Sequence, residues 1–312
     1  HGLNNHGLNN HGLNNHGLNN HGLNNHGLNN HGLNNHGLNN VDKRRMCPNC
    51  RAFITTSDKV CPYCGQQVGP RSVDVRQPGA VLGLIPHAYF TTVLILLINT
   101  ALYAATVWYG RVIGNFNLAL YAFGAKEGTA IWQQHEYWRL VTAGFLHGGI
   151  LHIAMNSWVF FDLGAQVEQV YGTPRFLAIY FVGTVGGFYL SALMSPGLSI
   201  GASAGITGLI GAMIAFGVAN RSTVGRQIRN FYVRWVVYIL AIGFIGGFGI
   251  DNFAHLGGLA AGFVVGYVAG DPVHSSRERE GIWRVIAAAC VAITIYCFWL
   301  MYVHFPTPDE LR

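Results

Sequence analysis

Long apolar runs, separated by short polar pieces, fill the chain from residue 88 onward. Each run is close to the ~20 residues that a helix needs to cross a bilayer. The pattern therefore predicts an all-α polytopic membrane protein in which every run is one spanning helix. Seven runs are present: Ala88–Tyr109, Ile150–Val167, Phe176–Met194, Ala202–Ala219, Tyr232–Gly249, Ala254–Ala269 and Ile282–Val303.

The composition favours a membrane protein over a soluble one. Of the 312 residues, 51% are hydrophobic and 10% are charged, whereas soluble domains carry about 25% charged residues. The net charge of +6 does not indicate nucleic acid, because most arginines stand at the ends of apolar runs and do not alternate with aromatic residues. We therefore expect the lipid bilayer, and no nucleic acid, as a partner. The first run is too long and starts too late for a cleavable signal peptide.

Basic residues predict how the helices are oriented. They cluster before the first run and in every second connection after it, and the positive-inside rule places such segments in the cytoplasm. The N-terminus is then cytoplasmic and the C-terminus lies on the outer face. The first outer loop, residues 110–147, is the exception, since it carries three basic residues and is long enough to form a substructure. The cytoplasmic set comprises Lys43, Arg44, Arg45, Arg71, Arg76, Arg175, Arg221, Arg226, Arg229, Arg234, Arg277, Arg279 and Arg284.

The N-terminal region is a perfect repeat. Residues 1–40 are eight copies of HGLNN, and a period of five fits neither a helix nor a strand. Because every unit is rich in Gly and Asn, we predict disorder over residues 1–45, with a His-rich metal tract as the alternative. The first methionine is Met46. Our hypothesis is that translation starts there and that the repeat is upstream DNA read as protein, which peptides from the repeat would contradict.

Four cysteines follow as two C-x2-C pairs separated by ten residues. Each pair can present two thiolates to one ion, and two pairs supply the four ligands of a tetrahedral site. We predict a zinc-ribbon-like module at residues 46–68 that holds structural Zn²⁺, with a redox or disulfide pair as the alternative. A linker at 69–87 follows, and Cys290 and Cys297 in the last run are expected to be core or lipid-facing. The ligands are Cys47, Cys50, Cys61 and Cys64.

Polar residues stand near the start of the second, fourth and sixth runs. By the predicted topology these three runs all begin on the outer face, so their polar residues lie at similar depth. Polar side chains within spans are costly and usually face the interior of the bundle. The residues are His147, His152 and Asn156 in the second run, Ser203 in the fourth and His255 in the sixth.

Small residues predict which helices meet. Stripes of Gly and Ala at helical spacing let two helix backbones approach closely in lipid. The fourth and sixth runs each carry such a stripe, and packing the two together would bring Ser203 close to His255. The stripes are Gly201, Gly205, Gly208 and Ala212, and Ala254, Gly258, Gly262 and Gly266.

A serine beside a histidine suggests nucleophilic catalysis. His255 could activate Ser203 as a general base. We predict a dyad rather than a triad, because the nearest carboxylate, Asp251, belongs to the outer connection. His152 and Asn156 are one helical turn apart and share a face. Their side chains, together with the Ser203 N–H, are the expected oxyanion hole, in which each donor contributes about 10²–10³ in turnover.

Other interpretations of these residues compete with the dyad. A serine in a membrane helix often bonds to its own turn, a histidine can be structural, and His147, His152 and His255 could hold a metal, although no H-E-x-x-H pattern accompanies them. The letters G-x-S-x-G also occur in soluble hydrolases, which need alternating strands and the order Ser, acid, His. A transporter would show inverted repeats and broken helices, which are not evident.

The motifs resemble those of the rhomboid intramembrane serine proteases over about residues 88–270. The resemblance implies a six-helix bundle with one extra C-terminal helix, the bacterial 6+1 form, in which residues 271–312 contribute a cytoplasmic loop, the seventh helix and a tail. It rests on EYWR at 136–139, HGGILHIAMN at 147–156, GASAGITGLIGA at 201–212 and AHLGGLAAGFVVG at 254–266.

The resemblance also implies roles. Ser203 would be the nucleophile and His255 its base, His152 and Asn156 would stabilise the oxyanion, and Trp138 and Arg139 would be structural; catalysis would need no cofactor. The substrates would be transmembrane segments of other proteins. The protein would be a multi-pass protein of the bacterial inner membrane, with its active site opening to the outer face. An inactive rhomboid-like protein that binds membrane clients is the alternative.

Two positions depart from the family pattern. Ala204 follows the serine where the family usually has Gly, and because Ala is small we expect it to be tolerated. Thr207 stands one turn after the serine, where the family often places an aromatic ring against the histidine. The sequence therefore does not show which contacts orient the His255 ring.

Overall fold

The computed structural model describes residues 44–47, 50, 52–55, 58, 60–65, 68, 90–245, 249–270 and 275–307. The repeat at 1–40 and the linker at 69–87, for which we expect no regular structure, lie outside the described residues. The chain divides into two compact units, His1–Asp74 and Val75–Arg312, and each is described by itself.

The first unit contains a short antiparallel hairpin. Strands β1 (Arg44–Met46) and β2 (Phe53–Thr55) pair with Met46 opposite Phe53. The hairpin positions Cys47 beside Ile54, Cys61 and Val68 in a small buried cluster. Arg44 and Arg45, which we placed in the disordered stretch, form β1 instead, because their backbone pairs with β2.

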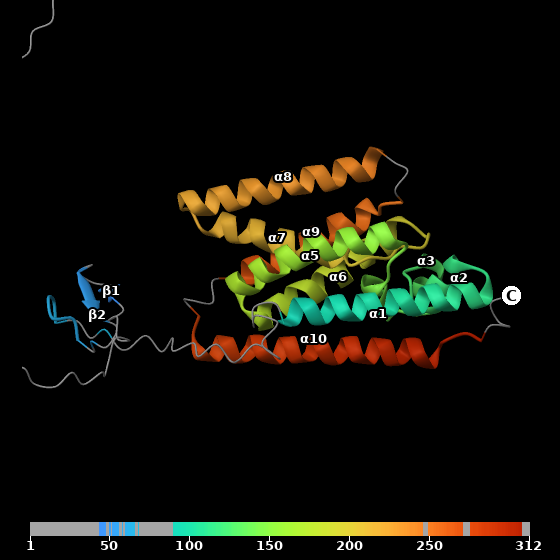
Figure 1. Cartoon of the computed structure of the whole chain (residues 1–312), viewed down its shortest axis with the longest axis horizontal. Coiled ribbons are helices and arrows are strands. Elements are labelled where there is room, and N and C mark those ends of the chain that lie inside the picture. Colours follow the sequence, from blue (N-terminus) through green and yellow to red (C-terminus); the bar gives the residue numbers. More distant parts are fainter. Residues whose placement is uncertain are drawn as a thin grey trace, which may run out of the picture. The chain divides into compact units, whose positions relative to one another are not determined.

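The regular secondary-structure elements that the structure describes in the second unit are all helices, and its seven long helices correspond one to one to the seven predicted runs (Figure 1). The all-α polytopic fold is therefore confirmed. The helices are α1 (Phe90–Ile113), α2 (Phe116–Ala122), α3 (Gly128–Trp132), α4 (Arg139–Thr142), the 3₁₀-helix η2 (Ala143–Phe145), α5 (Ile150–Tyr171), α6 (Thr173–Met194), α7 (Ser203–Ala219), α8 (Thr223–Ile245), α9 (Asn252–Ala269) and α10 (Arg277–Val303).

Among the described residues, five helices are long and apolar enough to cross a membrane: α1, α6, α8, α9 and α10. Helix α7 is strongly apolar but has only 17 residues. Helix α5 has the length, at 22 residues, but carries Asp162 and Glu168. The protein is an integral membrane protein, and the two exceptions are the helices that hold Ser203 and the pair His152 and Asn156.

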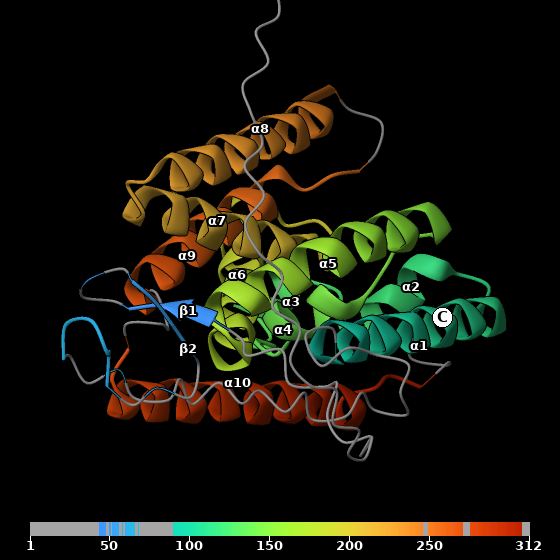
Figure 2. The ribbon, with the colours of Figure 1, turned by 60° about the vertical axis from the view of Figure 1, so that its left-hand side comes forward.

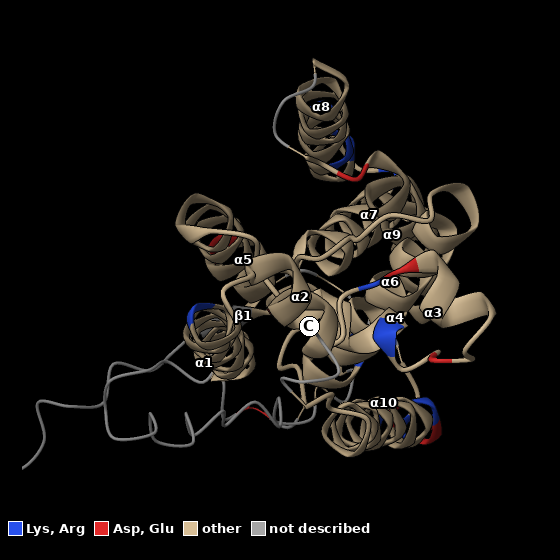
Figure 3. Ribbon diagram, turned by 90° about the vertical axis from the view of Figure 1, so that its right-hand side faces the viewer, with Lys and Arg blue, Asp and Glu red and all other residues tan. Residues whose placement is uncertain are grey.

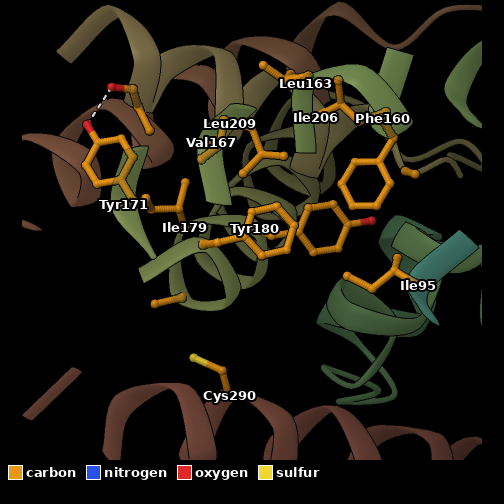
Figure 4. Packing of buried hydrophobic residues seen from close by; sticks show 14 of the residues in the cluster. Ile95, Phe160, Leu163, Val167, Tyr171, Ile179, Tyr180, Ile206, Leu209 and Cys290 are labelled. Atoms are coloured by element: carbon orange, nitrogen blue, oxygen red, sulfur yellow. Dashed lines mark hydrogen bonds between the residues drawn. The ribbon is translucent and has the colours of Figure 1, made fainter. Parts of the chain in front are cut away.

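Helices α6, α7 and α9 pack against one another and form the centre of the second unit. Viewed along the helices, α8 and α10 lie on opposite sides of this group, and most of the ribbon carries no charge (Figure 3). Helix α1 lies against α5 (Figure 2). Aromatic and aliphatic side chains of α5, α6 and α7 fill the interior, where the Tyr171 hydroxyl donates to the Ala212 carbonyl at 2.7 Å (Figure 4).

The small residues of α9 contact α7 as predicted. A Cβ added to Gly258 would lie 2.1 Å from the Ala204 carbonyl oxygen, and one added to Gly262 would lie 2.0 Å from that of Gly208. No side chain larger than hydrogen fits at either position, so the two backbones are in direct contact.

The predicted stripe on α7 needs a correction. Gly205 faces α6, where an added Cβ would lie 2.5 Å from the Tyr180 ring, and Gly201 precedes the helix. The α7 positions against α9 are instead Ala204, Gly208 and Ala212. The physical reason is helical geometry, because residues 204 and 205 differ by about 100° around a helix of 3.6 residues per turn.

The long loop at 110–147 is ordered, as its length and charge predict. Arg139 is buried, and its guanidinium donates to the Glu136 carboxylate at 2.5 Å and to the Tyr121 and Ala125 carbonyls at 2.7 and 3.1 Å. It also lies over the Trp138 ring, with 4.6 Å to the centroid. These contacts support a structural role for Trp138 and Arg139.

Candidate functional site

Ser203 is the first residue of α7 and follows a sharp bend at Gly201. Gly201 has φ +129°, a conformation that favours glycine, and its N–H donates to the Ala143 carbonyl at 3.0 Å. The first N–H groups of a helix have no intrahelical acceptor, and a helix N-terminus favours negative charge. The Ser203 hydroxyl therefore lies where an anionic intermediate would be stabilised.

His255 lies in the first turn of α9 and is largely buried. Its Nε2 is 3.0 Å from the Ser203 Oγ, the proximity that close packing of the fourth and sixth runs predicts. If Nε2 accepts from the serine, the proton of a neutral ring is on Nδ1. Within the described part of the chain no partner reaches Nδ1, and the Asp251 carboxylate bonds elsewhere, to Ser191 and the Ala254 N–H.

His152 reaches the same place from α5. The Gly148 N–H donates to its Nδ1 at 3.3 Å, which assigns the ring proton to Nε2. A Cβ on Gly201 would lie 2.9 Å from this Nε2 and 3.4 Å from the Ser203 Oγ, so the histidine and the serine both border the space that a side chain at position 201 would fill. Asn156 is one turn further along α5 and is buried.

His147 is buried next to this group. Its ring centroid is 5.2 Å from that of His152, and neither ring nitrogen has a hydrogen-bond partner among the residues that the structure describes. Among the described residues, the four cysteines form a group of ligand side chains close enough to share an ion, and His147, His152 and His255 are not part of such a group.

Ala204 and Thr207, the two residues that depart from the family pattern, both lie where α7 packs against neighbouring helices. The Ala204 methyl group fits because it lies against Gly187, where an added Cβ would be only 2.9 Å away. Thr207 donates to the carbonyl of Ala204 in its own helix at 2.9 Å, and its Oγ1 packs against Gly258 of α9. Thr207 therefore sets the spacing of the two helices rather than stacking on His255.

Two charged residues outside the spans adjoin the site, and sequence reasoning assigned neither of them to it. Burial lowers the pKa of the Lys126 ammonium, while the negative charges of Asp251 and Glu127 oppose this. Burial alone would raise the pKa of Asp251, but hydrogen bonds from Ser191, Ser199 and the Ala254 N–H, with the Lys126 charge, hold it below its usual value. An aspartate just before a helix is a recognisable N-cap signal; the burial of Lys126 has no such signal.

The four cysteines of the first unit could hold a metal ion. Their sulfur atoms all lie within 4.8 Å of one another, with Cys47 and Cys64 at 3.7 Å and Cys50 and Cys61 at 3.6 Å. A tetrahedral site with Zn–S bonds of about 2.3 Å places its sulfurs about 3.8 Å apart, whereas a disulfide needs about 2.05 Å. The sulfur spacing therefore fits a shared metal ion and is too long for a disulfide bond in this structure.

Comparison with known proteins places this geometry in a family. A family model described as Rhomboid domain matches residues 134–272, the segment that begins shortly before α4, runs through α9 and contains Ser203 and His255. The chain is 36% identical to rhomboid protease GluP of Bacillus subtilis over 195 residues, which is 61% of this chain and 36% of that protein.

Two further relatives are similar to the chain over about half of its length. RHOMBOID-like protein 1 of Arabidopsis thaliana is 34% identical over 160 residues, 50% of this chain and 41% of its own length. Rhomboid-like protease 3 of Toxoplasma gondii is 35% identical over 181 residues, 55% of this chain and 66% of its own length. The chain thus spans between about a third and two thirds of the relatives that it matches.

Proposed function

This chain belongs to the rhomboid family, and from that premise we propose that it is an intramembrane serine endopeptidase that cleaves transmembrane segments of other membrane proteins. The observation that supports this most directly is the 3.0 Å distance between the Ser203 Oγ and the His255 Nε2. A serine is a weak nucleophile until a base within hydrogen-bond reach can take its proton.

The proposed reaction proceeds by acyl transfer. His255 Nε2 takes the hydroxyl proton as the Ser203 Oγ attacks the carbonyl carbon of the scissile peptide bond. The oxyanion accepts hydrogen bonds from the His152 Nε2–H, the Asn156 amide and the Ser203 N–H. His255 then gives its proton to the leaving amine, which departs. A water molecule, deprotonated by His255, hydrolyses the ester and releases the new carboxyl terminus.

The substrate would enter sideways, from the lipid, past α8. Only 6% of the apolar window of α8 is buried, against 56% for α6, so α8 is the helix that can be displaced at least cost. Unwinding a helix in lipid exposes backbone groups that must find new partners. We therefore expect substrates with small or helix-breaking residues near the cleaved bond.

We assign the protease core to residues 88–270 and the cytoplasmic loop, seventh helix and tail to 271–312. The basic residues of alternate connections orient the N-terminus to the cytoplasm and the active site to the outer face. By resemblance to the 6+1 form, the membrane would be a bacterial inner membrane.

The module at residues 46–68 would hold Zn²⁺ through its four cysteines in a structural role, because four protein ligands close the coordination sphere. Loss of the metal from the purified full chain should unfold the module and leave the protease core active. Metal analysis should give one zinc per chain, and Cys61→Ser should abolish it. Stoichiometric iron in place of zinc would contradict the assignment.

Labelling by a fluorophosphonate probe tests the catalytic proposal. Wild-type protein in liposomes should be labelled and should cleave a model transmembrane substrate. Ser203→Ala should lose both activities. His255→Ala should slow both labelling and cleavage by at least ~10³-fold. Thermal unfolding checks that both variants stay folded. An unlabelled wild type that nevertheless retains transmembrane clients would instead support the inactive client-binding alternative.

A further inference from the structure

The loop that delivers Ser203 to His255 is held from one side by a buried lysine. Lys126, from the outer loop between α2 and α3, is fully buried. Its Nζ donates to the carbonyls of Ser195 and Gly197 at 2.7 and 2.9 Å. Its backbone exchanges two hydrogen bonds with Ser199, at 3.0 and 2.9 Å. Lys126 thus contacts three residues of the connection between α6 and α7.

The same loop is held from the other side by Asp251. The Asp251 carboxylate accepts from the Ser191 hydroxyl at the end of α6 and from the Ser199 side chain within the loop. Its second oxygen accepts from the Ala254 N–H at 3.0 Å and so caps α9. Asp251 therefore ties the loop to the helix that carries His255.

These contacts end at the two reacting side chains. Ser199 is four residues before Ser203, and between them Gly201 is fixed to Ala143. On the other helix, the His255 N–H donates to the Asp251 carbonyl at 3.2 Å. The hydrogen bonds of Ser199 and Asp251, together with the four-residue step along the chain from Ser199 to Ser203, thus link the start of α7 to the start of α9.

The chemistry of this network is unusual for a merely structural loop. A buried ammonium without partners is strongly unfavourable, and a loop could be closed with neutral groups. Here the positive and negative side chains both bond to the one segment that links α6 to α7. Such an arrangement favours one position of the loop, because the Lys126 ammonium has its acceptors, and the Asp251 carboxylate one of its donors, only when the loop is in place.

We propose that Lys126 and Asp251 are positioning residues that fix the loop at 195–201 and thereby hold the Ser203 hydroxyl within reach of His255. This assignment rests on the proposed function. Neither residue would touch substrate. They would act on the rate of acylation, because a displacement of about 1 Å at the reacting atoms costs about 10²-fold in rate.

The test measures the rate of fluorophosphonate labelling per folded molecule, in full-length protein in liposomes. Lys126→Met removes the ammonium at nearly constant length, and Asp251→Asn removes the charge but keeps a good N-cap residue. Each should slow labelling at saturating probe at least tenfold, while the probe concentration for half-maximal rate changes less than threefold. The double variant should lose no more than the worse single variant, since the two act through one loop.

A milder variant and a matched control separate positioning from stability. Ser199→Ala removes only one link to Asp251 and should slow labelling about threefold. Arg175 is equally buried at the opposite end of α6, where its guanidinium donates to Glu280 at 2.7 and 3.0 Å. Arg175→Met should lower the unfolding temperature as much as Lys126→Met does but leave the labelling rate per folded molecule unchanged.

The outcomes are distinct. An unlabelled wild type would overturn the proposed function and this assignment with it. A labelled wild type whose loop variants, including Ser199→Ala, react at the wild-type rate would overturn the assignment alone. An Arg175→Met rate that falls as far as that of Lys126→Met would show that general destabilisation accounts for the loss, and would also overturn it.

Discussion

Two of the long helices that contact α7, namely α9 and α8, meet it in different ways. Against α9 the backbones touch, with glycines at the points where any side chain would collide. Against α8 the closest approach is at one end, where an added Cβ on Gly217 would lie 2.7 Å from the Gly225 carbonyl oxygen. Beyond this point only Tyr232 of α8 is buried.

The difference separates two requirements of the proposed reaction. Ser203 and His255 stand on α7 and α9, and their 3.0 Å separation needs a contact that cannot slide. Entry of a transmembrane substrate needs a helix that can move aside, and α8 exposes apolar side chains such as Val237, Ile242 and Phe244 instead of packing them against the other helices. Rigidity and access are thus assigned to different neighbours of one helix.

The largest effect should come from disrupting the α7–α9 contact. Gly262→Val places two methyl groups where even a Cβ would lie 2.0 Å from the Gly208 carbonyl oxygen. Because both sides of the contact are backbone, the helices must separate, and we expect labelling to fall by more than ~10³-fold, with loss of folded protein as judged by thermal unfolding.

The control lies on the other side of the same helix. Val264 of α9 is well exposed, so Val264→Leu adds bulk that lipid accommodates. Labelling of this variant should stay within twofold of wild type. If Gly262→Val were as active as its control, direct backbone contact would not be what aligns the dyad.

A smaller loss is expected from restoring the family's aromatic residue at position 207. The Thr207 Oγ1 lies 2.7 Å from where a Cβ of Gly258 would be, so a ring in Thr207→Phe can enter only if α9 moves. We expect labelling to fall between about 10- and 100-fold. Thr207→Val keeps the shape and loses only the bond to Ala204, worth about 1 kcal/mol, and should react within threefold of wild type. A faster Thr207→Phe would mean that His255 lacks support in this protein.

Much of this fold could be predicted from the chain alone. Each helix of the bundle is encoded by its own apolar run, so seven helices could be located without knowing how they pack. The approach of Ser203 to His255 could be anticipated because glycines on α9 imply a close neighbour and the polar residues lie at one depth. The catalytic roles themselves stay a prediction.

What could not be predicted depends on contacts between distant segments. The face of α7 was misassigned by one residue, because Ala204 is as small as Gly205 and composition cannot tell which of them meets α9. From the sequence alone, Lys126 is one of three basic residues of the long outer loop, with nothing to mark it as buried. Its burial is created by the carbonyls of Ser195 and Gly197, some seventy residues later, and only the folded chain brings these groups together.

The smallest predicted effect concerns α8. The Tyr232 hydroxyl donates to the Gln166 side chain of α5 at 2.9 Å, a polar link between α8 and the rest of the bundle. Tyr232→Phe removes the link, worth about 0.5–1.5 kcal/mol. Since α8 would then open more readily, cleavage of a transmembrane substrate should rise two- to fivefold, while labelling by the small probe should not change.

The matched control is Tyr238→Phe, because Tyr238 lies on the same helix and is exposed. It should alter neither activity. Equal acceleration of cleavage and labelling by Tyr232→Phe would argue that the bond acts on the dyad rather than on access, and an unchanged cleavage rate would argue that α8 is not the helix that moves. Either result would mean that α8 does not control substrate access separately from the α7–α9 contact.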